Sequence, residues 1–261
     1  MFKLDFINNV HWLIFYSVII ISWFLLFILG ANYQVTEKSI GILDSEFWAS
    51  ICRPNANLFD FPKFFLMWAL MSLGMMLPTI IPTLRTYDDL IKGKIGNTAG
   101  FYKMVMGFCF VWVIFSSFAS LLQMLLIYLN LINFDGILFN PIFSGIVLLL
   151  AGTYQFSSLK DACLSKCRSP ITFFLEYGSQ VHKYEFSLGL RIGAYCLGCC
   201  WLLMLLAFIG GTMNLFFMAV AMLLMTFEKL PDIGIYVTKP IAFSLIILSF
   251  IYFLSPLRMY V

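Results

Sequence analysis

Long apolar runs are the feature that most constrains the fold of this chain. Residues 10–29, VHWLIFYSVIIISWFLLFIL, contain no Asp, Glu, Lys or Arg, and about 20 residues of helix cross the hydrocarbon core of a bilayer. Charged residues make up 11% of the chain and apolar residues 62%, whereas soluble domains carry about 25% charged residues. Too little polar surface is left for a soluble fold, so the sequence predicts an integral membrane protein.

The apolar runs predict an all-α, polytopic transmembrane bundle of about seven spans in one domain, residues 1–261. The expected spans are about 11–30, 63–83, 101–130, 138–156, 188–209, 212–227 and 240–255. Each must be helical, because lipid offers no partner to free backbone groups. Only Gly210 and Gly211 separate the fifth and sixth runs, which predicts a tight helical hairpin. The first run is too long for a signal-peptide core, so we expect it to be retained.

Lysine and arginine are distributed unevenly between the two predicted faces. Twelve of the sixteen basic residues, Lys160 and Lys229 among them, fall on one face and four on the other. The face rich in basic residues is the cytoplasmic one. We therefore expect the N-terminus in the cytoplasm and the C-terminus outside, in a bacterial inner (plasma) membrane. The loop at 31–62, with Cys52, would then be external, and the segment at 157–187 cytoplasmic.

Three cysteines, Cys196, Cys199 and Cys200, lie within the fifth run. Helix positions three and four apart share a face, so their sulfurs are expected to form a compact triangle near mid-membrane. Buried cysteines often only pack as small apolar side chains. Soft thiolates, however, select Cu(I), zinc or iron–sulfur clusters, and a bound monovalent cation offsets the cost of burying a thiolate. We therefore predict a metal site here, with simple packing as the alternative.

Methionines recur at helical spacing in two other runs. Met67, Met71 and Met75 form one stripe with Met76 adjacent, and the sixth run carries Met213, Met218, Met222 and Met225. Thioethers are neutral soft ligands that suit Cu(I), although methionine stripes also pack well in cores. Pro78 and Pro82 follow the first stripe, and a proline within a span bends the helix and frees carbonyl groups. The first stripe is therefore the stronger ligand candidate.

A second cysteine pair, Cys163 and Cys167, follows the fourth run. The i, i+4 spacing and the basic neighbours Lys160, Lys166 and Arg168 favour two thiolates on one face. Such a pair can hold one linear soft cation, but Cys-x-x-x-Cys alone is a weak motif. The alternative is a short interfacial helix with ordinary reduced cysteines.

Few other residues suggest chemistry. Gln123, Asn214 and Glu228, next to Lys229, are polar groups in or at apolar runs, where such groups are either functional or join helices. Arg85, Asp88 and Asp89 are expected to pair among themselves. The two histidines, His11 and His182, are too few for a histidine-based metal site. No nucleotide-binding, serine-hydrolase or zinc-protease motif is present, and we predict no catalytic or cofactor-binding residue.

Five segments in order resemble a known family: MMLPTIIP, GTYQFSSLKDACLSKCRSP, GLRIGAYCLGCCWLLM, GGTMNLFFMA and FEKLP. The family comprises predicted metal-binding integral membrane proteins that carry a domain of unknown function. At least one member is encoded beside a copper-dependent tyrosinase and is regarded as a copper chaperone. The resemblance covers about residues 63–232, and its Cys-x-x-x-Cys-Arg-x-Pro and Cys-x-Gly-Cys-Cys-Trp elements are specific.

The resemblance implies which residues bind the metal. The matching positions are Met75, Met76, Cys163, Cys167, Cys196, Cys199, Cys200 and Met213, the last with Asn214. Two departures from the family pattern are mild, since MSLGMM is less rich in methionine than is usual and Ser158 stands where the family has proline. Neither removes a soft ligand.

Residues and resemblance together predict a non-enzymatic membrane protein that binds Cu(I) or another soft metal. It would hand the ion to a copper-dependent enzyme or across the membrane. Its expected partners are the lipid bilayer and such an enzyme or a copper donor protein, with no nucleic acid and the oligomeric state left open. Cys163 and Cys167 would exchange the ion, the three central cysteines with Met75 and Met76 would hold it, and Met213 would release it.

Two other functions remain open from the sequence. The chain could be a non-catalytic accessory subunit of a membrane oxidase complex, with its sulfur-bearing faces serving as helix contacts. It could also be a thiol redox relay that uses Cys163 and Cys167.

Overall fold

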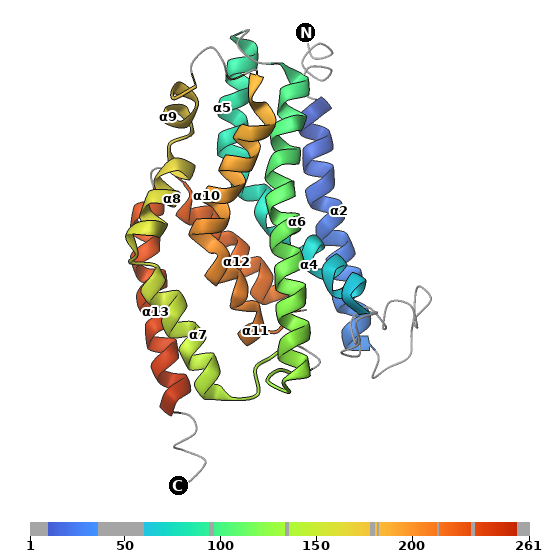
Figure 1. Ribbon diagram of the computed structural model, residues 1–261, viewed down its shortest axis with the longest axis vertical. Helices are drawn as coiled ribbons and strands as arrows, with labels where there is room; N and C mark the ends of the chain where they lie inside the picture. The colour runs from blue at the N-terminus through green and yellow to red at the C-terminus, as the bar shows by residue number, and fades with distance from the viewer. Residues whose placement is uncertain are drawn as a thin grey trace.

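The computed structural model describes residues 10–35, 60–93, 97–133, 136–177, 181, 183–212, 214–230 and 233–254. These residues form an elongated bundle of helices (Figure 1). In chain order the elements are α2 (Val10–Val35), α4 (Phe61–Met76), the 3₁₀ turn η2 (Leu77–Ile80), α5 (Ile81–Lys92), α6 (Thr98–Tyr128), α7 (Pro141–Tyr154), α8 (Ser158–Arg168), α9 (Pro170–Leu175), α10 (Glu185–Leu205), α11 (Ala207–Gly210), α12 (Leu215–Glu228) and α13 (Gly234–Leu254).

The predicted helical bundle is confirmed, but the predicted number of seven spans is not. Five helical stretches of the described residues are long and apolar enough to cross a membrane, namely Val10–Leu29, Phe61–Lys92, Thr98–Tyr128, Glu185–Gly210 and Tyr236–Leu254. The pair α7 and α8 adds a sixth if it counts as one span, and it is bent by 61°. The sixth apolar run forms α12, which has only 14 residues.

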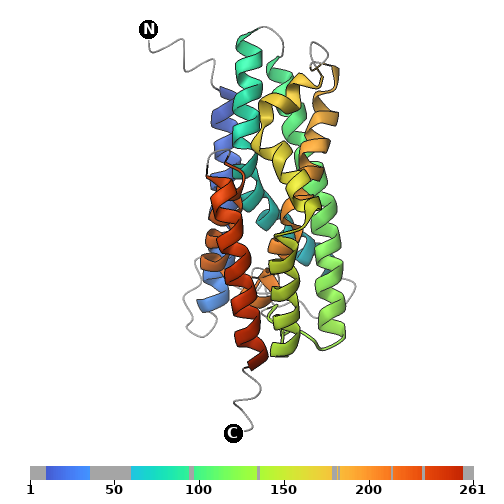
Figure 2. The ribbon, with the colours of Figure 1, turned by 90° about the vertical axis from the view of Figure 1, so that its left-hand side faces the viewer.

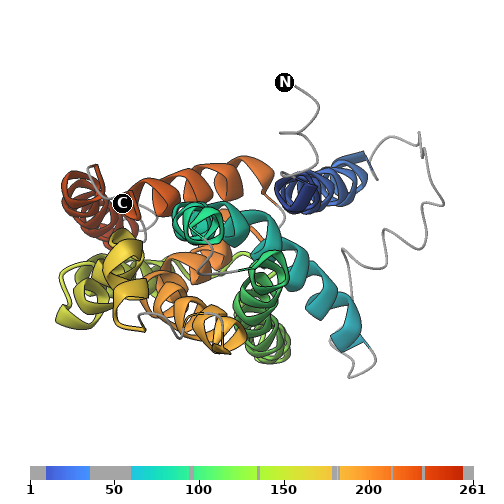
Figure 3. The ribbon, with the colours of Figure 1, turned by 90° about the horizontal axis from the view of Figure 1, so that it is seen from above.

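The expected hairpin after α10 is built from short pieces. Gly211 has φ +91°, a backbone conformation that is costly for residues with a Cβ. Asn214 begins α12 by accepting a hydrogen bond from the Phe217 backbone N–H at 3.1 Å, which satisfies a free donor of the first turn. Asn214 therefore has a capping role. Seen from above, α12 runs obliquely between α2 and α13 (Figure 3).

Small residues set the closest helix contacts. Gly107 on α6 and Gly189 on α10 face the partner backbone, so that a Cβ at either position would collide with it, at Phe186 O and Met104 O respectively. α13 lies beside α7 (Figure 2), and there Gly152 faces Ile246. Close approach of backbones at small residues is a common way to pack helices in membranes.

The two prolines interrupt the second long span, as the sequence predicted. α4 ends at Met76, η2 follows with Pro78, and α5 begins with Pro82 in its first turn. Proline cannot donate a backbone hydrogen bond, so the α-helical hydrogen-bond pattern is interrupted here and resumes in α5. The break turns Met76 and Thr79 into the bundle, where both are buried.

Gln123 and Asp88, two of the polar residues singled out in the sequence, have structural partners. Gln123 on α6 accepts a hydrogen bond from Trp68 Nε1 of α4 at 2.7 Å. Asp88 pairs with His11 Nε2 and with Lys92 Nζ, each at 3.1 Å. Arg85 takes no part in the ion pairs found among the described residues, so the expected pairing of Arg85 with its two aspartates is wrong.

The packing at Gly189 predicts a large effect of a small substitution. Gly189→Val places side-chain atoms against the α6 backbone, which cannot yield as a flexible side chain would, and overpacking costs about 1–3 kcal/mol. Thermal unfolding in detergent should therefore shift to clearly lower temperature. Gly93→Ala is the control, because its Cβ would meet nothing closer than 3.5 Å. Equal melting temperatures for the two variants would contradict this packing.

Candidate metal centre

The central cysteines lie on α10 where it faces α8 and η2. Cys196, Cys199 and Cys200 are each at most 2% exposed. Helical spacing places all three on the buried side of α10, as the sequence predicted. The thiols of Cys199 and Cys200 both donate to the Cys196 carbonyl, at 3.1 and 2.7 Å. The three side chains are therefore neighbours with hydrogen-bonded thiols.

A methionine at the end of α4 also contacts the cysteines of α10. Met76, the last residue of α4, places Sδ 3.9 Å from Cys200 Sγ. Met75 is buried beside it, and Met71 and Met67 continue the buried stripe along α4. The structure thus brings Met76 to the cysteines directly and Met75 into the same core.

The cysteine pair of α8 also reaches α10. Cys167 is buried, and its thiol interacts with that of Cys199. Cys163, one turn earlier, packs on Gly198, where a Cβ would lie 2.8 Å from Cys163 Sγ. The glycine in Cys-Leu-Gly-Cys-Cys therefore lets the second cysteine pair approach the first. Tyr154 supports this contact by donating to the Gly198 carbonyl at 2.5 Å.

We call Met76, Cys167, Cys196, Cys199 and Cys200 the sulfur cluster. Its members are soft donors and all are buried, which fits a soft cation that sheds its water. Within the described ranges no three or more His, Cys, Asp or Glu side chains are already arranged to hold a metal ion. The thiols of Cys199 and Cys200 instead donate to the Cys196 carbonyl, so these side chains would have to rotate to form a ligand set.

Lys229 is a functional candidate that the sequence reasoning missed. It directly follows α12 and is only 3% exposed. Its Nζ donates to Cys196 Sγ at 2.8 Å and to Thr79 Oγ1 at 3.0 Å. Lys229, which the charge count placed on the predicted cytoplasmic face, is therefore buried against the sulfur cluster and is not an exposed loop residue.

Lys160, which the charge count placed on the same predicted face, is likewise buried, in the first turn of α8. Its side chain is fully buried, and Nζ lies 2.8 and 2.9 Å from the two carboxylate oxygens of Glu228. Gln155 accepts from the same ammonium group, and Arg168 Nε donates to the Glu228 carbonyl at 2.8 Å. This polar network fastens the bend between α7 and α8 to the end of α12.

Because the charge rule concerns residues in loops, these two buried lysines weaken the charge count on which the predicted orientation was based. Without them, ten basic residues remain on the predicted cytoplasmic face, against four on the other. The signal that could have found Lys229 is the run FEKLP, in which Glu228 ends an apolar helix and Lys229 follows it without a polar loop. Met213, the proposed release ligand, lies outside the described residues, as do Cys52 and His182.

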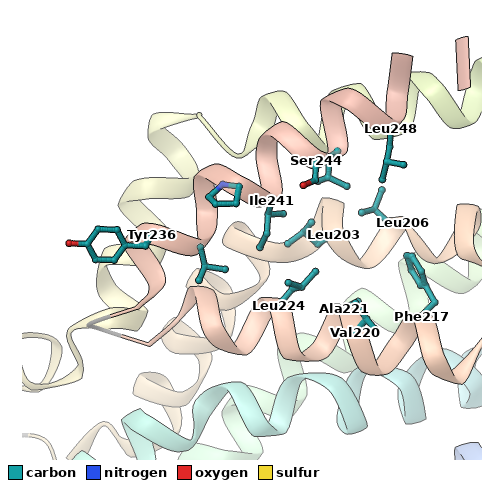
Figure 4. A pocket seen from close by; sticks show the side chains of 13 residues that line it. Leu203, Leu206, Phe217, Val220, Ala221, Leu224, Tyr236, Ile241, Ser244 and Leu248 are labelled. Atoms are coloured by element: carbon teal, nitrogen blue, oxygen red, sulfur yellow. The ribbon is translucent and has the colours of Figure 1, made fainter. Parts of the chain in front are cut away.

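An apolar pocket of about 470 Å³ lies between α12 and α13, over the end of α10 (Figure 4). Leu203, Leu224 and Ile241 are among the residues that line it. None of its lining residues is Cys, Met or His, so it supplies no soft ligand and is separate from the sulfur cluster.

The buried pair of Lys160 and Glu228 predicts a strong asymmetry between variants. Glu228→Gln leaves the Lys160 charge unpaired in the interior, which costs about 3–5 kcal/mol. The double variant Lys160→Met/Glu228→Leu removes both charges and should recover most of that loss. Thermal unfolding in detergent measures both effects. Asp89→Asn is the control, because its ion pair with Lys92 is exposed and should matter by less than about 1 kcal/mol. A double variant no more stable than Glu228→Gln alone would contradict the pairing.

Comparison with known proteins supports the resemblance seen in the sequence. A family model described as PpoB2, copper chaperone, matches residues 65–252. That range includes every described cysteine and methionine of the sulfur cluster. Comparison with curated proteins found no match, and comparison with solved structures found none either. The family model covers well over half of the chain, so the chain belongs to the PpoB2 copper chaperone family.

Proposed function

We propose that this protein is a membrane-embedded carrier that binds Cu(I) with buried sulfur ligands and passes it toward a copper-dependent enzyme. The observation that carries the proposal is a continuous row of sulfur side chains across the bundle. The row runs from Cys163 and Cys167 on α8, through Cys199 and Cys200 on α10, to Met76 on α4. Family membership supports copper as the cargo.

The chemistry of this row suits a cuprous ion. Thiolate and thioether sulfur are soft ligands that select Cu(I) over harder cations, and Cu(I) is stable with as few as two ligands. A third sulfur next to a two-coordinate ion can bind before one of the first two leaves. Neighbouring pairs of sulfurs therefore permit stepwise transfer without release of the ion into the apolar interior.

The exposure of the sulfurs along this row suggests the direction in which the ion would move. Cys163 is partly exposed, whereas the sulfur cluster is buried, so Cys163 with Cys167 would take up the ion. The cluster with Met75 would hold it. Met71 and Met67 lead toward the other end of α4, and Met213, which lies outside the described residues, is the proposed release ligand. In this scheme the residues bind and exchange copper, and no catalytic step is required.

Membrane insertion is part of the same proposal. Large apolar side chains are exposed along the long helices, for example Ile20, Phe24 and Phe27 on α2 and Phe250 on α13. Such surfaces need lipid or a partner to cover them. α2 begins at the opposite end of the bundle from that at which α13 ends (Figure 1). This arrangement supports termini on opposite faces of the membrane. The excess of basic residues on one predicted face supports a cytoplasmic N-terminus and an external C-terminus, in a bacterial inner (plasma) membrane.

Copper binding by the double variant Cys167→Ser/Cys199→Ser tests the proposal. The protein would be purified in mild detergent under anaerobic, reducing conditions and titrated with Cu(I) against a chromophoric chelator. We expect wild type to bind copper and the double variant to lose more than about 100-fold in affinity. The reason is that loss of even a supporting partner of a metal ligand costs about 10–100-fold.

Cys109→Ser is the matched control, because Cys109 lies on α6 and outside the sulfur cluster. It should bind Cu(I) as wild type does. A wild-type protein that stays free of copper after loading would contradict the proposal. It would favour the accessory-subunit interpretation, in which the sulfurs only pack between helices. A reversible disulfide between Cys163 and Cys167, with no copper bound, would favour the redox relay instead.

A further inference from the structure

Lys229 places a positive charge inside the sulfur cluster. Its ammonium group contacts Cys196 Sγ at 2.8 Å, and the side chain is 3% exposed. Among the ion pairs of the described residues, none joins Lys229 to a carboxylate. A buried charge without a counter-charge is costly. The thiols around Lys229 are therefore the groups that can supply the missing negative charge.

The other charges at this place cancel or lie at the edge. Lys160 and Glu228 form a buried pair at 2.8 Å with no net charge. Arg168 is partly buried and binds the Glu228 carbonyl and Thr238 Oγ1. Cys196 is the thiol in contact with Lys229, and the thiols of Cys167, Cys199 and Cys200 lie close enough to interact with it electrostatically. One positive charge, that of Lys229, is thus left for the sulfur cluster to balance.

The charge of the bound metal decides whether that balance is reached. When two thiols bind Cu(I), each loses its proton to solvent, and the resulting bis-thiolate complex carries one negative charge. Together with the Lys229 ammonium the centre is then neutral. A divalent ion bound by the same two thiolates forms a neutral complex, so the charge of Lys229 stays unbalanced unless a third thiol also loses its proton and binds. In a low-dielectric interior this difference favours the monovalent ion.

We propose that Lys229 is the specificity-determining residue of the copper centre, because its fixed positive charge selects a monovalent soft cation over a divalent one. This inference rests on the proposed function, since it assumes that the sulfur cluster binds the cargo. It adds the reason why Cu(I) would be accepted and soft divalent ions of similar ligand preference rejected.

Thr79 holds the ammonium group in place for this role. Its hydroxyl donates to the Met76 carbonyl at 2.7 Å and accepts from Lys229 Nζ at 3.0 Å. The hydroxyl thereby ties Lys229 to the residue that carries the thioether ligand. The break at η2 is what turns Thr79 inward, so the same local structure positions both the neutral soft ligand and the counter-charge.

Metal competition with charge variants at Lys229 tests the inference. The affinities of wild type, Lys229→Met and Lys229→Arg for Cu(I) and for Cd(II), a soft divalent probe, would be measured against chelators. We expect Lys229→Met to bind Cu(I) about 10-fold more weakly and Cd(II) about 10-fold more tightly. The ratio of the two affinities then falls by about 100-fold. Lys229→Arg keeps the charge and should keep the ratio near that of wild type.

A purely structural role of Lys229 gives a different result. It would lower both affinities in parallel and leave their ratio unchanged, and that outcome overturns the inference while the proposed function stands. If the wild-type protein binds no Cu(I), the proposed function itself is overturned. If Lys229→Met does not fold, the variant Thr79→Val tests the inference instead. It keeps the charge of Lys229 and removes the hydroxyl that accepts a hydrogen bond from its ammonium group. Its affinity ratio should fall by a smaller factor, and an unchanged ratio again overturns the inference.

Discussion

The centre of this bundle depends on compensating charge that is buried far from water. Lys160 on α8 and Glu228 at the end of α12 each need the other, because an isolated charge in the interior is costly. Their pairing fixes where the bend after α7 meets α12, and it brings the next residue, Lys229, against Cys196. The position of the candidate metal centre thus follows from an ion pair that contains none of its ligands.

Close helix packing is the second feature on which the candidate metal centre depends. Gly189 lets α10 approach α6, and Gly198 lets Cys163 of α8 lie directly on α10. The proline break at η2 then turns Met76 toward Cys200. Three elements distant in sequence therefore deliver soft sulfur to one place, and an ammonium group lies beside it. A cuprous bis-thiolate satisfies both the ligand preference and the charge of this place, which is why copper carriage is the function proposed here.

The sequence was a good guide to what depends on local periodicity. Apolar runs predicted the long helices, and spacing predicted one buried face for Cys196, Cys199 and Cys200. The resemblance indicated the copper chaperone family, which the family match confirms. The failures concern tertiary contacts. Lys160 pairs with a residue 68 positions away, and no local pattern shows that. The predicted seven spans are not confirmed, because among the described residues α7 and α12, although apolar, have only 14 residues each. Which sulfurs bind the ion stays a prediction.

X-ray absorption spectroscopy of the copper-loaded wild-type protein tests the central claim most directly, because it reports the oxidation state of the metal and the elements bound to it. We predict cuprous copper with a low coordination number and only sulfur ligands. Nitrogen or oxygen ligands bound to cupric copper would contradict it, because the sulfur cluster would then not be the site that holds the cargo.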